Sequence, residues 1–434
     1  MQTSRMRHSD RTRAEELDAS SLRNKSVRHR CVGCGKEFPH SFNPFCDCGH
    51  MVDVEYDLKG ARLYESPNPY IRYFDLLPLE SPESLLPVRQ TMTPTHHAME
   101  LGKLLGLRWL YLKDETVLPT RTTKDRMAVV VLSFFREVGV KEFACSSTGN
   151  SSTALAHWIP YFPQCKMHVF TGQDFLDRLN FAETDQVNVI ALRGGTFVEA
   201  FAEAAQFAKR TGVASEGGFF NPARREGLKT TFLEAAESVP RPIDWYVQAV
   251  SSAMGVYGAY KGAKEFLAMG HIVRLPRLLC VQQATCCPMV SAFEAGSKTI
   301  RPEDIVRRPT GIASAILRGD PTRVYPYVRE IVVESGGTFA SVNEGEIRQA
   351  RRMVEEYEGL SPCFTASTAV AGLVRLAKEG LIHADQTVLV NLTGADRGPQ
   401  PPLGNVNWLD RTPEGWRAGQ DQHPPARELR KGTE

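Results

Sequence analysis

The chain of 434 residues has a formal net charge of +2, with 42% hydrophobic and 24% charged residues, as expected of a globular protein with two or three domains. Because the charge is nearly balanced, composition predicts no nucleic acid partner. No run of 18 apolar residues is present, so we expect no membrane span, and the N-terminus lacks the apolar segment of a secretory signal. Six of the ten cysteines lie in apolar or mixed runs, which is typical of reduced cytoplasmic proteins.

Residues 1–30 contain eight lysines and arginines against four acidic residues, with few large apolar side chains. We expect this segment to be a disordered, mildly basic tail, because it has too little apolar surface to bury. A transit-like or nucleic-acid-binding role is the alternative interpretation of its charge.

A cysteine-rich segment follows, CVGCGKEFPHSFNPFCDCGH, in which Cys31 and Cys34 are two residues apart and Cys46 and Cys48 one residue apart. A Cys-x-x-Cys turn aims two thiolates at one point, and a second close pair can complete a tetrahedral zinc site. Two interpretations stay open for residues 31–55: a zinc-ribbon-like segment, in which His50 could replace one thiolate, and a knuckle that has lost its metal and only packs. In both cases we expect a structural appendage.

From about Leu110 onward, short apolar runs alternate with amphipathic stretches. The runs LRWLYL, KEFACSS, KMHVFTG, NVIALRGG, WYVQAV, RLLCVQQ and TVLVNLTG are typical of strands, and TFVEAFAEAAQFAKRTG has the apolar spacing of a helix. This order predicts an α/β fold with parallel sheets covered on both faces, whose ligands bind at the carboxyl ends of the strands. After Gly398 the sequence becomes Pro-rich and polar, and we expect residues 399–434 to form a tail.

Four loops after strand-like runs carry the polar residues expected of a site. Lys124, in TRTTKDRMA, lies at the start of a helix, where the helix dipole favours the neutral, nucleophilic amine. The loop SSTGNSSTALA carries Asn150, and VNLTGADRG carries the hydroxyl of Thr393. AVSSAMGVYG, residues 249–258, is a strand-to-helix turn of the kind that offers backbone N–H groups to a phosphate. Each loop alone is common in α/β proteins, whereas their order along the chain is more specific.

Together these loops resemble those of the fold-type-II enzymes that use pyridoxal phosphate, and most closely those of the threonine synthases. The resemblance rests on the cysteine-rich segment, IRYFDLLP (71–78), YLKDETVLPT (111–120), TTKDRMA (122–128), STGN (147–150) and NPARREGLKT (221–230). It covers roughly residues 31–398. It implies a two-domain, parallel-sheet architecture of the tryptophan-synthase-β type with the N-terminal cysteine-rich ribbon. The catalytic region would span residues 56–398 and contain a smaller sheet domain at roughly 125–215.

The resemblance also implies how the cofactor, pyridoxal 5′-phosphate, would be held. Lys124 would form a Schiff base with it, Asn150 would contact its ring hydroxyl, and Thr393 would bind its pyridine nitrogen. A hydroxyl in place of a carboxylate at the pyridine nitrogen suits elimination and replacement chemistry. The phosphate would be bound by Ser251, Ser252, Ala253, Met254 and Gly255.

The substrate side departs further from the threonine synthase pattern. The family's Gly-Ser-Phe before the lysine is Arg-Thr-Thr at 121–123, its glycine-rich phosphate loop is Ser-Ser-Ala-Met, and RQTMTPTHH (89–97) keeps only Thr-Pro of a further family segment. We therefore expect a paralogue with another substrate, and Arg121 is the leading candidate to bind an anionic leaving group. The expected substrate contacts are Arg121, Thr123, Thr93, Ser147, Thr148, Arg224 and Lys229.

The expected function is that of a cytoplasmic lyase or synthase of amino-acid biosynthesis, which catalyses β- or γ-elimination or replacement on an O-phosphorylated or similarly activated amino acid. One alternative is a cysteate-synthase-like exchange of the phosphate of O-phosphoserine for sulfite, because VQQATCCPMVSAFEAG (281–296) is similar to that relative's segment. An alternative of another class is a non-catalytic relative that binds a ligand or partner, which the loss of loop glycines favours. The expected partners are a small amino-acid substrate and a second copy in a homodimer, with no membrane.

Overall fold

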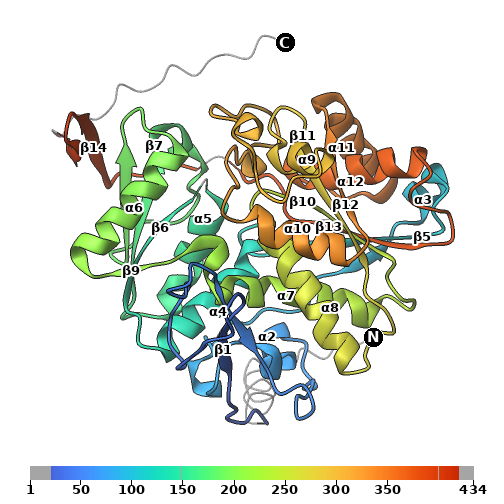
Figure 1. Cartoon of the computed structure of the whole chain (residues 1–434), viewed down its shortest axis with the longest axis horizontal. Helices are drawn as coiled ribbons and strands as arrows, with labels where there is room; N and C mark the ends of the chain where they lie inside the picture. The colour runs from blue at the N-terminus through green and yellow to red at the C-terminus, as the bar shows by residue number, and fades with distance from the viewer. Residues whose placement is uncertain (1–20, 148, 399, 420–434) are drawn as a thin grey trace, which may run out of the picture.

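Two six-stranded sheets and one three-stranded sheet organise the protein (Figure 1). The structure is a computed structural model, and it describes residues 21–147, 149–398 and 400–419. Each six-stranded sheet forms one lobe with the helices that cover it. The α/β architecture with two mostly parallel sheets, expected from the sequence, is confirmed.

The larger lobe is built on a sheet with the strand order β12-β11-β10-β13-β5-β4. Its strands are β4 (Thr95–His97), β5 (Trp109–Asp114), β10 (Trp245–Ala249), β11 (Arg277–Gln283), β12 (Thr338–Val342) and β13 (Thr387–Leu392). Neighbouring strands are parallel except β4, which runs antiparallel to β5. The central strands β10 and β13 are buried at every residue, because helices cover both faces, and this is why they appear in the sequence as continuous apolar runs.

The smaller lobe has a sheet with the strand order β15-β14-β8-β7-β6-β9. Its strands are β6 (Glu142–Ser146), β7 (Lys166–Gly172), β8 (Val187–Leu192), β9 (Ala214–Ser215), β14 (Val406–Thr412) and β15 (Gly415–Ala418). β14 pairs parallel to β8, and β15 closes an antiparallel hairpin with it.

The hairpin of β14 and β15 comes from the segment after residue 398, for which the sequence favoured a polar tail. Leu409 and Trp416 pack against the apolar cluster under helix α6 (Phe197–Thr211), and the Arg193 guanidinium lies 4.4 Å from the ring centroid of Trp408. Residues 406–418 are therefore part of the smaller lobe, where they cover the edge of β8. The rest of the expected tail, residues 420–434, lies outside the described residues.

The helices begin and end at the signals that their sequences carry. They are α2 (Pro69–Arg72), α3 (Met99–Leu105), α4 (Lys124–Glu137), α5 (Asn150–Trp158), α6 (Phe197–Thr211), α7 (Pro222–Ser238), α8 (Met254–Ala268), α9 (Pro288–Glu294), α10 (Tyr325–Glu334), α11 (Glu344–Glu358) and α12 (Phe364–Lys378). The start of α6, for example, has a capping box of Thr196 and Glu199, and the helix ends at Gly212 in a left-handed conformation. In the described parts of the chain, none of these helices has both the length and the apolar character that a membrane crossing requires.

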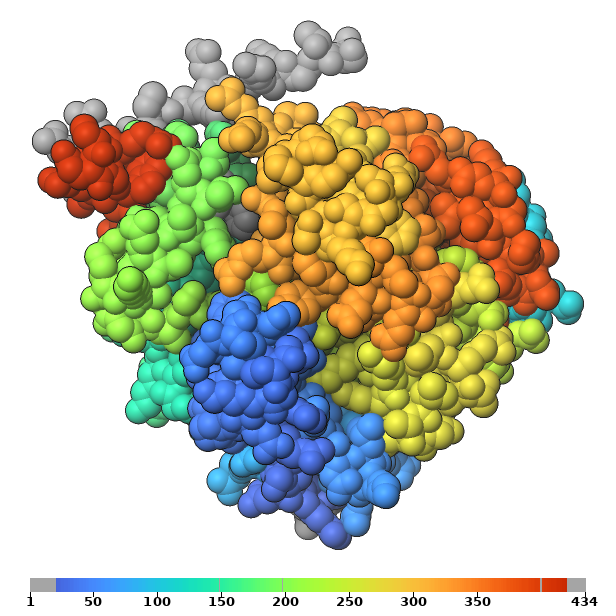
Figure 2. All heavy atoms as spheres, viewed as in Figure 1, coloured from blue at the N-terminus to red at the C-terminus, as the bar shows by residue number. Residues whose placement is uncertain are grey.

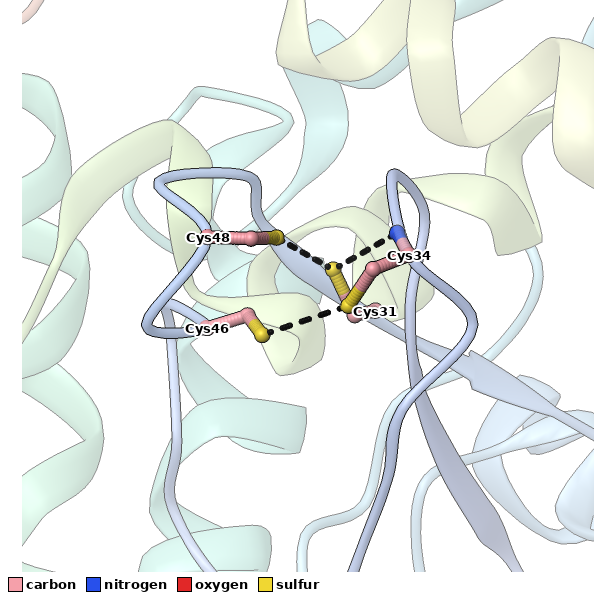
Figure 3. A group of neighbouring side chains, drawn as sticks. All are labelled: Cys31, Cys34, Cys46 and Cys48. Carbon is pink, nitrogen blue, oxygen red and sulfur yellow. Dashed lines mark hydrogen bonds between the residues drawn. The ribbon is translucent and has the colours of Figure 1, made fainter.

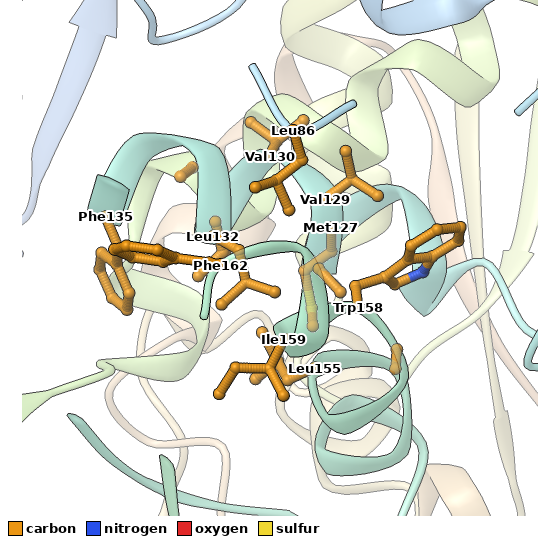
Figure 4. Packing of buried hydrophobic residues seen from close by; sticks show 14 of the residues in the cluster. Leu86, Met127, Val129, Val130, Leu132, Phe135, Leu155, Trp158, Ile159 and Phe162 are labelled. Carbon is orange, nitrogen blue, oxygen red and sulfur yellow. The ribbon is translucent and has the colours of Figure 1, made fainter. Parts of the chain in front are cut away.

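Helix α4 is enclosed on every side, because all residues from Asp125 to Phe135 are buried. Most of them are apolar, from Met127 to Leu132 without interruption, as is typical of a fully buried helix. Figure 4 shows Met127 and Leu132 of α4 facing Leu155 of α5 and Ile159, which directly follows that helix. This packing fixes the first turn of α4, and thus Lys124, relative to the smaller lobe.

The N-terminal sheet is antiparallel, with β1 (Arg28–Cys31) between β2 (Glu37–Phe38) and β3 (Val52–Glu55). β1 begins inside the segment for which a disordered tail was expected, since Val27 and His29 are buried and the Lys25 amine donates to the Leu77 carbonyl (2.7 Å). Residues 1–20 of that segment lie outside the described residues. Figure 2 shows the N-terminal segment (blue) against the junction of the smaller lobe (green) and the larger lobe (yellow to orange).

Candidate active site

A cavity lies where loops from the two lobes meet, at the carboxyl ends of the parallel strands β6, β10 and β13. This is the place where α/β sheets bind ligands. The structure brings four predicted loops together there. The predicted site residues that line the cavity are Arg121, Thr123, Lys124, Ser147, Asn150, Arg224, Ser251, Ser252, Ala253, Met254, Gly255 and Thr393.

Lys124 is the first residue of α4, and its side chain keeps partial exposure to the cavity. The pKa of its amine is lowered from 10.5 to about 8, chiefly by burial and also by the positive charge of Arg224, while Glu115 opposes the shift. The amine has no hydrogen-bond or ion-pair partner among the described residues. A lysine with these properties is present in large part as the neutral amine near pH 8, which is the nucleophilic form.

The loop before Lys124 is held by backbone contacts on both sides. The Thr123 N–H donates to the Thr393 carbonyl (2.9 Å), and the Ala395 N–H donates to the Arg121 carbonyl (2.9 Å). The Asp125 carboxylate accepts from the Thr120 N–H (2.7 Å). The loop is thereby fixed to the end of β13 and to the first turn of α4.

Two non-glycine residues of the described chain have a positive φ, Arg121 (55°) and Ala253 (57°), and both line the cavity. The left-handed conformation costs a residue with a Cβ atom about 1–2 kcal/mol. Both residues therefore carry a side chain at the cavity on a backbone that favours glycine, at a cost in stability.

The turn at residues 251–255 leads into α8, whose first N–H groups have no carbonyl partner in their own helix. Such a helix start is suited to bind a phosphate. A Cβ atom at Gly255 would lie 2.7 Å from the Gln248 side-chain nitrogen, so a larger residue there would require the Gln248 side chain to move.

Asn150 begins α5 directly after Gly149, which has a φ of 125°. Its side-chain oxygen accepts a hydrogen bond from the Arg397 guanidinium. Thr393 follows β13, and its hydroxyl has no hydrogen-bond partner within residues 21–419 as described. Both side chains line the cavity.

Some expected substrate contacts are absent from the cavity. Thr93 is buried and donates to Glu115 (2.7 Å), so it belongs to the buried charge network around Arg126. Lys229 is fully buried between Glu226 and Glu265, 2.7 Å from the latter. The expectation for these two residues is corrected, because ion pairs and hydrogen bonds inside the protein already use their polar groups. Thr148, also expected to contact substrate, lies outside the described residues.

Arg224 and Ser147 line the cavity, but their polar atoms are already engaged. Arg224 forms a two-point ion pair with the buried carboxylate of Glu216, and it donates to the Ser151 hydroxyl (3.1 Å). The Ser147 hydroxyl accepts from the Gly149 N–H (3.0 Å) and so caps the turn into α5. Arg224 is thus neutralised as a binding group for an anion.

The sequence-based prediction missed Arg318 and Cys363, which also line the cavity. Burial lowers the pKa of the Arg318 guanidinium, whose Nε donates to the Asp320 carbonyl (3.2 Å). Like Arg121, Arg318 has no carboxylate within ion-pair distance among the described residues. Its segment, ILRGDP, has no motif that would have identified it.

The four cysteines of the N-terminal segment form a compact group (Figure 3). The sulfur atoms of Cys31 and Cys48 are 3.4 Å apart, those of Cys34 and Cys46 are 3.6 Å apart, and all four lie within 4.8 Å of one another. Four sulfurs at about 2.3 Å from a zinc ion would be separated by about 3.8 Å. The group can therefore hold a metal ion such as zinc. His50 is not part of it.

If this group holds zinc, purified protein should contain about one zinc per chain, and Cys31→Ser should lose the metal. We expect the variant to lower the free energy of unfolding by more than about 2 kcal/mol, a part of the roughly 10–16 kcal/mol that a structural zinc contributes in zinc-finger peptides. Intrinsic activity should fall less than stability. Elemental analysis and denaturant unfolding measure both, with Cys287→Ser, outside the group, as control. Metal-free wild-type protein with unchanged stability would contradict the zinc site.

Comparison with known proteins places this fold and cavity in one class. The sequence pattern described as "Pyridoxal-phosphate dependent enzyme" matches residues 88–394, more than half of the chain. The chain therefore belongs to the family of pyridoxal-phosphate dependent enzymes. Within that family it is a fold-type-II member of the threonine synthase and cysteate synthase group.

Relatives and solved structures agree with that assignment. The threonine synthase of Methanocaldococcus jannaschii is 29% identical over 375 residues, which cover 84% of this chain and 91% of that protein. The cysteate synthase of Methanoculleus marisnigri is 30% identical over 400 residues, covering 86% of this chain and 89% of that protein. Among solved structures, maize serine racemase matches with a TM-score of 0.58 at 16% identity, over 71% of this chain and 89% of that chain, which supports the fold alone.

The cavity residues fit the cofactor of this family. The cavity offers an amine without a partner, and the start of the 15-residue helix α8 for a phosphate. In addition, the hydroxyls of Thr123 and Ser146 are buried at the cavity without any hydrogen-bond partner in the described structure. Buried hydroxyls are seldom left unpaired, so these two indicate that a polar ligand completes the site.

Proposed function

We propose that the protein is a pyridoxal-phosphate dependent lyase or synthase that acts on an amino acid with an anionic leaving group, such as an O-phosphorylated amino acid. The observation that carries this proposal is the combination of one amine without a partner, Lys124, and two cations without carboxylate partners, Arg121 and Arg318, in one cavity. The amine of Lys124 suits covalent attachment of the cofactor, and the guanidinium groups of Arg121 and Arg318 suit the binding of a leaving anion.

On this proposal, each cavity loop has one task. Lys124 would hold the cofactor and would move the proton at the substrate Cα. Asn150 would donate to the ring oxygen of the cofactor, the turn 251–255 would bind its phosphate, and Thr393 would bind its pyridine nitrogen. When bound, the cofactor would supply an electron-withdrawing ring next to the substrate Cα.

The substrate side is where this chain differs from the threonine synthase pattern. Arg121 and Arg318 would bind the leaving anion with charge-assisted hydrogen bonds, since arginine matches the geometry of phosphate and carboxylate groups. Arg224 would instead support the cavity through its ion pair with Glu216. A rebuilt anion site favours a substrate other than that of a threonine synthase.

The test is a panel of activated amino acids, with release of the leaving group as the readout. O-phosphoserine, O-phosphohomoserine and O-acetylserine, each with and without sulfite, separate β- from γ-chemistry and elimination from replacement. Cysteate formed from O-phosphoserine and sulfite would favour the cysteate-synthase-like reaction, which is the second candidate because relatives of that name are 25–30% identical to this chain. A protein that binds pyridoxal phosphate but converts no member of the panel would favour the non-catalytic alternative.

A further inference from the structure

Arg397 lies at the crossing from β13 of the larger lobe to β14 of the smaller lobe, and its guanidinium contacts four neutral oxygens. Its Nε donates to the Thr120 carbonyl (3.1 Å), in the loop that leads to Lys124. Its Nη1 donates to the Thr153 hydroxyl (3.3 Å) and the Arg178 carbonyl (3.4 Å). Its Nη2 donates to the side-chain oxygen of Asn150. Arg397 thus joins the loop before Lys124 to the first turn of α5 by side-chain hydrogen bonds.

The contact with Arg397 determines which way the Asn150 amide faces. A guanidinium has donors only, so Asn150 must present its oxygen to it, and the opposite orientation would bring two donors together. The Asn150 Nδ2 group therefore faces away from Arg397. It has no partner among the described residues, and Asn150 lines the cavity. The amide thus has one fixed end and one free donor at the site.

We infer that Arg397 is a positioning residue, which holds Asn150 so that its Nδ2 group donates to the ring oxygen of pyridoxal phosphate. The inference rests on the proposed function, in which Asn150 binds that oxygen. It adds a residue outside the cavity lining that makes Asn150 a donor toward the cofactor, so that the ring oxygen has to act as an acceptor.

The positive charge of Arg397 also favours an acceptor oxygen as the partner of Asn150. The carboxylate of Asp125 acts on the charge of Arg397 without forming an ion pair with it. Its two oxygens accept instead from the Thr120 N–H (2.7 Å) and the Trp158 indole N–H (2.8 Å). Burial raises the pKa of Asp125 to about 6, so this carboxylate is a weak counter-charge below that pH. A partly buried cation bonded only to neutral oxygens favours a negative charge nearby.

The experiment is a double-mutant cycle on cofactor affinity. Apo-protein of wild type, Arg397→Met, Asn150→Ala and the double variant is titrated with pyridoxal phosphate at fixed pH, and the visible spectrum of the bound cofactor is recorded. We expect Arg397→Met to weaken binding about tenfold, or about 1.4 kcal/mol. Asn150→Ala should weaken it at least as much, and the double variant should be no worse than Asn150→Ala.

Arg178→Met is the matched control. Arg178 also links the lobes, because its Nη1 donates to the Ser314 carbonyl (3.3 Å), yet its side chain has no described contact with Asn150. We expect its affinity for pyridoxal phosphate to stay within about twofold of wild type. If Arg397 only linked the two lobes, Arg397→Met and Arg178→Met would change the affinity for pyridoxal phosphate to the same degree.

Asn150→Asp provides a test that does not depend on the folding of Arg397→Met. The new carboxylate keeps the contact with Arg397 but has no donor to turn toward the cavity, so cofactor affinity should fall at least about tenfold. Wild-type affinity in this variant would overturn the inference. The inference would also be overturned if Arg397→Met bound pyridoxal phosphate as tightly as wild type. It would be overturned as well if Arg397→Met weakened binding by the same factor in wild type and in the Asn150→Ala variant. Wild-type protein that takes up no pyridoxal phosphate would instead overturn the proposed function itself.

Discussion

Replacing Lys124 by alanine should abolish covalent attachment of pyridoxal phosphate and lower turnover by at least about 10³-fold, within the range that a lost catalytic proton transfer produces. The amine is the one lysine of the cavity, and burial lowers its pKa to about 8. Stability should not fall, because the variant removes an amine whose charged form is disfavoured by burial and which has no described partner. A loss of activity without a loss of stability distinguishes a site residue from a structural one.

The measurement combines borohydride reduction of the cofactor-loaded protein, mass determination and thermal unfolding. Wild type should retain the reduced cofactor covalently at Lys124, and Lys124→Ala should retain none. Lys103→Ala is the control, since its ion pair with Glu100 is exposed and remote from the cavity. A variant that still attached the cofactor and turned over like wild type would show that Lys124 is not the cofactor lysine.

Replacing Arg121 by alanine should reduce kcat/KM by about 10- to 100-fold, which corresponds to the roughly 1.5–3 kcal/mol of a hydrogen bond to a charged group, provided that it is made in the transition state. The spectrum of the bound cofactor should remain unchanged. The physical reason is that Arg121 lines the cavity without a carboxylate partner and keeps a left-handed backbone despite its side chain. We expect O-phosphohomoserine to be a poor wild-type substrate and a shorter activated amino acid, such as O-phosphoserine, to be preferred.

Arg121→Gly separates the effect of the side chain from that of the backbone. Both variants should lose activity to a similar degree, whereas only the glycine should raise the free energy of unfolding, by about 1 kcal/mol, because it relieves the strain at φ 55°. Arg411→Ala, at an exposed ion pair in the smaller lobe, is the control for loss of a positive charge. Efficient wild-type conversion of O-phosphohomoserine to threonine would reject the paralogue interpretation, and unchanged kcat/KM in Arg121→Ala would remove Arg121 from the substrate site.

Much of the fold could be predicted from the sequence because its signals are local. Buried parallel strands appear as apolar runs such as WYVQAV, and helix starts carry caps such as Thr196. The hairpin of β14 and β15 was missed because VNWLDRT is only partly buried and follows a Pro-rich stretch. Its strand character comes from pairing with β8, more than 200 residues earlier in the chain, and local patterns contain no record of such a partner.

The candidate site was also predictable only in part. Its four loops carry short motifs, and the sequence alone predicted that they form one site. The structure places all four around one cavity, at Lys124, Asn150, residues 251–255 and Thr393. The substrate contacts were harder to predict, because a charged residue type does not reveal its partner. Lys229 proved to be held between two buried glutamates, whereas Arg318, in a segment without a motif, reaches the cavity.

The sequence by itself determined the fold class, the family resemblance, the loops of the candidate site and the group of four cysteines, since each of these is a short local pattern and the loops follow one another in a specific order along the chain. Only the tertiary structure decided which cations remain without a counter-charge and which way the Asn150 amide faces. Those properties depend on distances between segments far apart in sequence, such as the 247 positions between Asn150 and Arg397. The strength of an ion pair or hydrogen bond falls off within a few ångströms, so the packed chain is required to decide them.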